Sequence, residues 1–174
     1  MNSKTMQQLA LGLVFALGSM AAQATVMFEA FLTGANEVPS NGSTASGFGT
    51  VVLNDAETMI TVDLSWLGLT APATAAHIHG PASPGVNAAV LFPLSGVPSA
   101  VSGAISQQSF TITAPRVAEL QAGLFYFNVH DATFPGGEIR GQILQVNVPE
   151  PVTIALMGLG LAGIGYTRRR ILLH

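Results

Sequence analysis

One stretch of the chain alternates between apolar and polar side chains over its whole length. Between residues 59 and 66 the order is Ile60, Thr61, Val62, Asp63, Leu64, Ser65, Trp66. A period of two residues is typical of a half-buried antiparallel strand, because successive side chains of a strand point to opposite faces. Other segments with strand character, divided by clusters of Gly, Pro, Ser and Asn, are 26–32, 48–54, 75–79, 88–94, 100–105, 110–113, 124–130 and 138–146.

A short helix is predicted between two of these strands, over residues 115–123. Pro115 suits the first turn of a helix, and Gly123 suits the position just after its C-terminus. About eight or nine short strands at this spacing, with a single helix, are typical of an all-β fold. We therefore predict an antiparallel Greek-key sandwich or barrel, flanked by an N-terminal signal helix and a C-terminal transmembrane helix.

The N-terminal segment has the layout of a secretion signal. Lys4 supplies a positive charge, residues 9–17 are apolar, and Ala22-Gln23-Ala24 has the small-x-small pattern that signal peptidase cleaves. The apolar run is about half as long as a transmembrane helix requires. We predict a signal peptide over 1–24, with an uncleaved signal anchor as the alternative.

The C-terminal segment has three parts in a fixed order. Pro149, Glu150 and Pro151 come first, a mostly apolar stretch over 152–166 follows, and the cluster Arg168, Arg169 and Arg170 comes last. Fifteen helical residues cover about 22 Å, against an apolar bilayer core of about 30 Å, so the span is marginal. Arginines at its end favour a cytoplasmic C-terminus, which places the preceding domain on the outer side of the membrane.

This segment, residues 148–174, closely resembles the PEP-CTERM sorting signal of Gram-negative bacteria. The resemblance implies recognition by an exosortase, cleavage near Pro149-Glu150-Pro151, and a transient hold in the inner membrane. It also implies delivery to the periplasm, the outer surface or a matrix of extracellular polysaccharide. A plain C-terminal anchor is the alternative.

The charge and the cysteine content exclude several functions for residues 25–147, the segment between the two ends. It contains eight acidic residues and two arginines, a net charge of −6, and the chain has no cysteine. Nucleic-acid binding requires cations that displace condensed counterions, so we predict that the domain binds no nucleic acid. The lack of cysteine excludes thiol catalysis, thiolate metal sites and disulfides.

Four short motifs in this segment resemble the CHRD domain, a module first described in chordin and found in bacterial exported proteins. They are residues 32–39 (LTGANEVP), 76–81 (AHIHGP), 123–130 (GLFYFNVH) and 136–142 (GGEIRGQ). The resemblance implies a β-sandwich-like fold and an exported location. It implies no established catalytic reaction.

Histidines are the candidates for chemistry in this domain. His77 and His79 are two residues apart on a predicted strand, so their side chains leave the same face. With His130, and with Asp131 as a fourth or outer ligand, they form a plausible site for Zn²⁺ or Cu²⁺. The alternative is structural, with the imidazoles hydrogen bonded across strands or to a turn carbonyl.

These observations lead to one preferred function and two alternatives. We predict a non-enzymatic surface or matrix module that is processed by signal peptidase and exosortase and binds a protein, an exopolysaccharide or a metal ion. The first alternative is a metalloenzyme, similar to superoxide dismutase, built on the three histidines, and the second is a passive structural component outside the cell. Glu138 and Arg140 share a strand face and are predicted to form a structural ion pair, and the loop 80–87 is the first place to look for a ligand.

Overall fold

The alternating segment forms the middle of one wall of a β-barrel. The computed structural model describes residues 26–146 and, near the C-terminus, residues 158, 160 and 161. Strand β3 (Met59–Leu67) lies between β2 (Ser46–Leu53) and β6 (Gly103–Thr111). Its four apolar side chains from Ile60 to Trp66 are at most 3% exposed, so the predicted inner face is confirmed.

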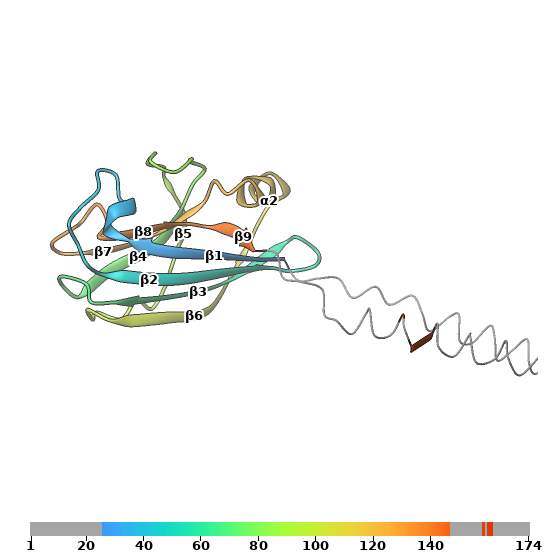
Figure 1. Cartoon of the computed structure of the whole chain (residues 1–174), viewed down its shortest axis with the longest axis horizontal. Helices are drawn as coiled ribbons and strands as arrows, with labels where there is room; N and C mark the ends of the chain where they lie inside the picture. The colour runs from blue at the N-terminus through green and yellow to red at the C-terminus, as the bar shows by residue number, and fades with distance from the viewer. Residues whose placement is uncertain (1–25, 147–157, 159, 162–174) are drawn as a thin grey trace, which may run out of the picture.

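The described domain contains nine strands, one short 3-10 helix and one α-helix (Figure 1). The remaining elements are β1 (Val26–Thr33), η1 (Gly34–Asn36), β4 (Ala73–His79), β5 (Val90–Pro93), α2 (Ala114–Gln121), β7 (Tyr126–Asp131), β8 (Ile139–Gln142) and β9 (Leu144–Val146). All strand pairs are antiparallel, and the order across the sheet is β5-β4-β7-β8-β1-β2-β3-β6, with β9 also pairing with β1.

This single sheet curls until its two edge strands, β5 and β6, approach each other. The rings of Phe92 on β5 and Phe110 on β6 are 5.2 Å apart between centroids. The side chain of Gln108 accepts a hydrogen bond from the backbone N–H of Ser95 and donates one to its carbonyl oxygen. The fold is therefore a nearly closed barrel, which decides between the predicted sandwich and barrel.

Among the described residues, the buried apolar side chains that fill the barrel lie between Phe28 and Ile143, and α2 covers one end of it. Val117 and Leu120 of α2 point into this core. Pro115 lies in the first turn of the helix, and Gly123, just beyond its end, has φ of +70°, which confirms the predicted helix. Because a continuous apolar core lies within 26–146, we expect this domain to fold on its own.

Two predicted segments differ from the structure. The separate strands predicted over 100–105 and 110–113 are one strand, β6, which carries a bulge where Gln107 has φ of +56°. The single strand predicted over 138–146 is divided at Ile143, whose buried side chain lies in the core and whose N–H donates to the carbonyl of Phe125. That division lets β8 pair with β7 while β9 pairs with β1.

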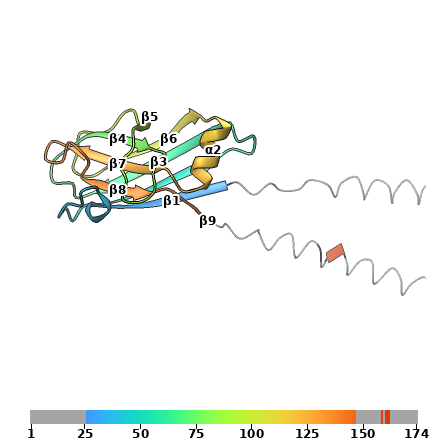
Figure 2. The ribbon, with the colours of Figure 1, turned by 90° about the horizontal axis from the view of Figure 1, so that it is seen from above.

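The strand register defines two ends of the barrel. At one end Met27 of β1 pairs with Val146 of β9, so the described domain begins and ends at the same place, beside α2 (Figure 2). At the other end of β1, one row across the sheet joins Thr33, Arg140, Asn128 and His77.

In the part of the chain that the structure describes, no helix is long and apolar enough to cross a membrane. The predicted signal peptide, including Ala22 and Ala24, lies outside the described residues. The same holds for Pro149, Glu150 and Pro151 and for Arg168, Arg169 and Arg170 of the predicted sorting tail.

Candidate metal site

Two neighbouring strands bring the three histidines of the domain together. On β4, Ala76 and Ile78 point into the core, so His77 and His79 leave the outer face of the barrel. Strand β7 pairs with β4 and places His130 opposite Ala75, with its side chain on the same outer face. The period-two prediction for the histidine pair is therefore confirmed.

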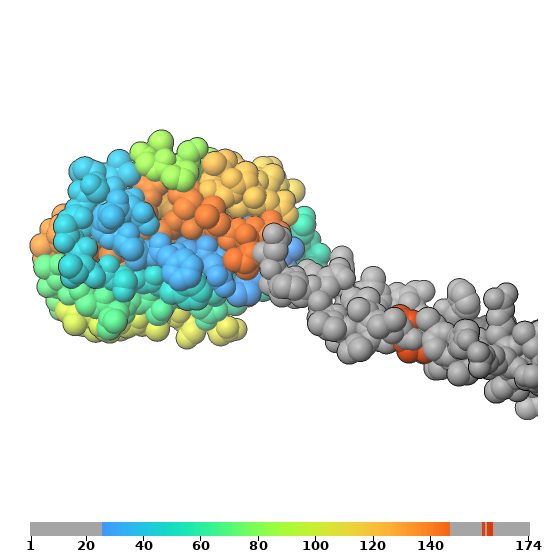
Figure 3. Space-filling model, viewed as in Figure 1, coloured from blue at the N-terminus to red at the C-terminus, as the bar shows by residue number. Residues whose placement is uncertain are grey.

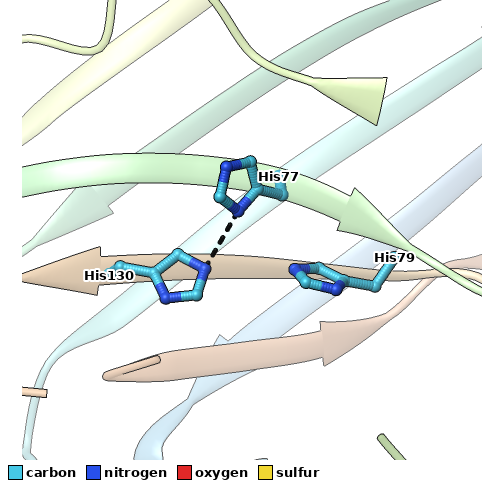
Figure 4. A group of neighbouring side chains, drawn as sticks. All are labelled: His77, His79 and His130. Atoms are coloured by element: carbon cyan, nitrogen blue, oxygen red, sulfur yellow. Dashed lines mark hydrogen bonds between the residues drawn. The ribbon is translucent and has the colours of Figure 1, made fainter. Parts of the chain in front are cut away.

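The three imidazoles face one another (Figure 4). The Nδ1 atom of His77 lies 3.1 Å from the Nε2 atom of His130, and one ring nitrogen from each histidine lies within 4.8 Å of the others. The ring centroid of His79 is 5.5 Å from that of His77 and 6.1 Å from that of His130.

Backbone carbonyls fix the tautomers of two of these rings. The Nδ1–H of His79 donates to the carbonyl of Ala88, and the Nδ1–H of His130 donates to the carbonyl of Pro135, both at 3.0 Å. A carbonyl oxygen only accepts, so the proton of each neutral ring is on Nδ1 and the lone pair is on Nε2. Hydrogen bonding of one ring nitrogen to a carbonyl is the usual support of a metal-binding histidine.

The Nε2 atom of His79 is buried and has no hydrogen-bond partner among the described residues. A buried polar atom without a partner costs free energy, so such atoms are rare in folded proteins. The Nε2 atom of His130, by contrast, accepts from Nδ1 of His77. The structural alternative, hydrogen bonding across strands or to a turn carbonyl, therefore accounts for the His77–His130 pair and for Nδ1 of His79, but leaves Nε2 of His79 without a partner.

Burial keeps these imidazoles neutral. It is the largest cause that lowers the pKa of His77, His79 and His130 below the ordinary value, and the charge of a neighbouring imidazole lowers each of them further. The carbonyls of Ala88 and Pro135 oppose this effect for His79 and His130. Neutral imidazole is the form that binds a metal ion.

The spacing of the nitrogens fits a small transition-metal ion. Zinc binds imidazole nitrogen at about 2.0–2.1 Å, so two nitrogens on a tetrahedral ion are about 3.3 Å apart. The separation of 3.1 Å between His77 and His130 is close to this value, and the full set of three nitrogens lies within 4.8 Å. An ion would replace the His77–His130 hydrogen bond, with the proton of His77 moving to its Nε2 atom.

Asp131, predicted as a fourth or outer ligand, is not brought to the histidines. As the residue after His130 on β7, it points to the opposite face of the strand and is buried. Its carboxylate accepts from the N–H of Ala71 at 2.7 Å and from the N–H of Phe134 at 2.6 Å. Asp131 thus fixes two loops at the end of the barrel.

The His79 ring packs against a stack formed by the side chains of Tyr126 and Arg140. The Tyr126 ring lies parallel to the His79 ring, with 5.0 Å between centroids and 7° between planes. The guanidinium of Arg140 also lies over the Tyr126 ring, 3.4 Å from the ring centroid. The Tyr126 hydroxyl accepts from the N–H of Ala88, the residue whose carbonyl holds His79, so ring and loop are fixed together.

The predicted ion pair between Glu138 and Arg140 is wrong. Glu138 is buried and accepts hydrogen bonds from the N–H and hydroxyl of Thr70 and from the hydroxyl of Ser43. Over residues 26–146, Arg116 and Glu119, 2.7 Å apart on α2, form the one ion pair. Sequence reasoning did not connect Arg140 or Tyr126 with His79, although the period of two already placed Tyr126 on the face of His130.

The family model described as "CHRD domain" matches residues 28–143, which span the barrel from β1 to Ile143. The chain belongs to the CHRD domain family. This CHRD domain is followed by residues 147–170, which match the PEP-CTERM protein-sorting motif. No curated protein and no solved structure matches the chain.

The two matches agree with both sequence resemblances. The PEP-CTERM motif marks the chain as an exported protein that an exosortase sorts through its C-terminal segment. CHRD domains are not a known enzyme family, so the family assigns no reaction to the histidines.

Proposed function

We propose that this protein is a surface or matrix module whose CHRD domain binds one Zn²⁺ or Cu²⁺ ion through His77, His79 and His130. The buried, unpartnered Nε2 atom of His79 carries this proposal, because a metal ion is the partner that its lone pair lacks. Two further imidazoles lie within reach of the same point. A tetrahedral ion held by three imidazoles keeps one position for a water molecule or a ligand.

We favour metal binding over catalysis by a dismutase-like metalloenzyme. A catalytic site needs a base or a second polar group beside the open position of the metal. The carboxylate nearest in sequence, Asp131, is engaged by two backbone N–H groups on the other face of β7. The role that these contacts support is therefore a bound ion that rigidifies the domain or links it to a partner.

The route to the site of action is also part of the proposal. Signal peptidase would remove residues 1–24 after Ala24, and the tail from 148 to 174 would hold the protein in the inner membrane of a Gram-negative cell until exosortase acts. The processed domain, residues 25–147, would then reach the outer surface or the extracellular matrix. Exopolysaccharide and other surface proteins are the partners that fit this location.

Metal analysis of the isolated domain tests the proposal directly. Residues 25–147, made without a tag, are stripped of metal, incubated with Zn²⁺ or Cu²⁺, desalted and analysed by mass spectrometry. We expect one ion per chain and a higher melting temperature for the loaded protein, since a ligand that binds only the folded state stabilises it. His79→Gln should abolish both effects.

A matched control separates the site from weak binding at the acidic surface. Asp55 is an exposed carboxylate in the turn between β2 and β3, so Asp55→Asn should leave the stoichiometry at one. Metal content near zero in the wild-type domain would refute the proposal. So would one ion per chain in the triple variant with all three histidines replaced by glutamine.

A further inference from the structure

Arg140 is a buried cation that forms no ion pair with any described residue. Its side chain is 2% exposed, and its nitrogens donate to the carbonyl of Val86 at 2.8 Å and to the side-chain oxygen of Asn87 at 3.1 Å. No carboxylate oxygen of residues 26–146 lies within 4.0 Å of the guanidinium. Burial of a charge without an opposite charge is costly, so a protein that keeps one there has a use for it.

A pocket of about 280 Å³ opens beside this guanidinium. It lies between the segment that follows β1 and the loop 80–89, and its walls include Asn36, Glu37, Pro84, Gly85, Arg140 and Gln142. The two segments adjoin at the surface, seen as blue and green atoms at the top of Figure 3, and the Asn87 side chain bridges them by donating to the carbonyl of Val38. This volume is at the lower limit for small-molecule sites and fits a ligand of one sugar unit or less.

The other polar groups of the pocket are acceptors. The Asn36 side-chain nitrogen donates to the carbonyl of Arg140, and that of Gln142 donates to the carbonyls of Ala82 and Gly123. The side-chain oxygens of Asn36 and Gln142 accept no hydrogen bond from a described residue and are not buried. One cation surrounded by oxygen acceptors suits a ligand with one carboxylate and several hydroxyl groups.

Glu37 is the one carboxyl group in the pocket wall. Both its oxygens accept from the side-chain nitrogen of Asn128, at 3.1 and 3.2 Å, so it is turned toward β7 rather than toward Arg140. Burial raises its pKa to about 7, although the charge of Arg140 opposes this shift. Near neutral pH, Glu37 therefore neutralises Arg140 only in part.

We propose that this pocket binds a small hydroxylated carboxylate, such as a sugar acid, with its carboxylate on Arg140 and its hydroxyl groups on the oxygens of Asn36 and Gln142. No histidine lines the pocket, although Arg140 also stacks on Tyr126 beside His79, so the proposal is tested on metal-free protein. Binding of the ligand to metal-free protein therefore decides whether this proposal is correct.

Three probes test the proposal on the isolated, metal-free domain: glucuronate, glucose and propionate. Titrations followed by NMR chemical shifts at pH 8 should give tighter binding of glucuronate than of either other probe, since only glucuronate has both a carboxylate and sugar hydroxyls. Glu37→Gln removes a like charge from the wall and should tighten glucuronate binding roughly fivefold. It should leave glucose binding unchanged.

A steric variant tests the location without touching the buried arginine. Ala35 is exposed at the pocket wall, so Ala35→Trp should fill the pocket and abolish glucuronate binding. Ala118 on α2 is also exposed, and Ala118→Trp is the matched control that should bind as the wild type does. Arg140→Gln should weaken glucuronate binding at least about tenfold, in line with the loss of a charge-assisted hydrogen bond.

Two results would overturn the proposal. One is glucuronate binding no tighter than that of glucose or propionate. The other is undiminished glucuronate binding in Ala35→Trp. Because Arg140→Gln also removes a buried side chain that holds the loop 80–89, its circular dichroism spectrum must match the wild type before its affinity is compared.

Discussion

Glu37 carries a carboxyl group whose surroundings disfavour its charge. It is 7% exposed, its nearest hydrogen-bond donor is an amide, and its pKa is raised from 4.5 to about 7. In the unfolded chain the same group ionises with an ordinary pKa. The folded state therefore loses stability relative to the unfolded state as the pH rises from about 4.5 to 7, and this loss is complete above pH 7.

Glu37→Gln removes that charge with little change of shape. We expect the variant to exceed the wild type in free energy of unfolding by about 1–3 kcal/mol at pH 8, and the difference to vanish at pH 4.5. Urea unfolding of the metal-free domains at the two pH values measures it. A difference that is equal at both pH values would mean that the group does not titrate in this range.

The sequence was sufficient to predict the histidine cluster, but not the backbone carbonyls that hold the imidazole rings in place. A period of two on each strand places His77 beside His79 and puts His130 on the face of Tyr126, so local geometry is enough once β4 and β7 are paired. The same period argues against Asp131 as a ligand, since adjacent strand residues point to opposite faces. The carbonyls of Ala88 and Pro135 belong to loops, whose conformation no periodicity predicts.

Among the strands, β2 approaches the opposite wall of the barrel so closely that only a glycine fits. A Cβ atom on Gly49 would lie 2.5 Å from the ring of Phe127 on β7, which is fully buried and cannot move aside. This contact packs the wall that carries the histidines against the wall formed by β2 and β3.

Gly49→Ala tests that contact. We expect it to lower the free energy of unfolding by about 1–3 kcal/mol, the usual cost of overpacking a core. Gly42→Ala is the control, because Gly42 is exposed and a Cβ atom there meets nothing within 4 Å. It should change the free energy by less than about 0.5 kcal/mol. Equal effects in thermal or urea unfolding would show that the close approach does not limit packing.

Most strands could be predicted because one face of each is in the core, whereas edge strands follow the pattern less closely. The polar run Ser106-Gln107-Gln108-Ser109 resembles a turn in sequence, yet it lies inside β6, where the strand bulges at the barrel edge. Asp63 on β3 stabilises the bulge by accepting from the N–H of Gln107. Such a long-range contact leaves no trace in local composition.

At the scale of the whole molecule, the barrel and the sorting motif occupy separate stretches of the sequence. Residues 28–143 match the CHRD domain and residues 147–170 match the PEP-CTERM motif. Sequence motifs alone were therefore enough to recognise both. We expect the three arginines of the tail to keep the C-terminus on the cytoplasmic side, because arginines beside an apolar stretch favour that side of the membrane.

Replacement of Arg168, Arg169 and Arg170 by glutamine tests the sorting step in the native host. We expect the full-length precursor to accumulate and the mature form at the surface or in the medium to fall at least several-fold, as judged by fractionation and immunoblotting. Arg116→Gln, on the surface of the barrel, is the matched control for loss of an arginine and should be processed normally. Normal release of the triple variant would contradict sorting through this tail.

The register of β1 shows that the two rims of the barrel carry different features. The described domain begins at Val26 and ends at Val146, and both residues lie at one rim. The row that joins Thr33, Arg140 and His77 lies at the opposite rim. The two rims are about 23 Å apart along the eight residues of β1. Attachment of the chain before Val26 or after Val146 would therefore leave the rim with Thr33, Arg140 and His77 facing away from the attachment point. The domain would then separate the proposed ligand sites from the membrane, and exosortase cleavage would move the domain without changing which rim carries those sites.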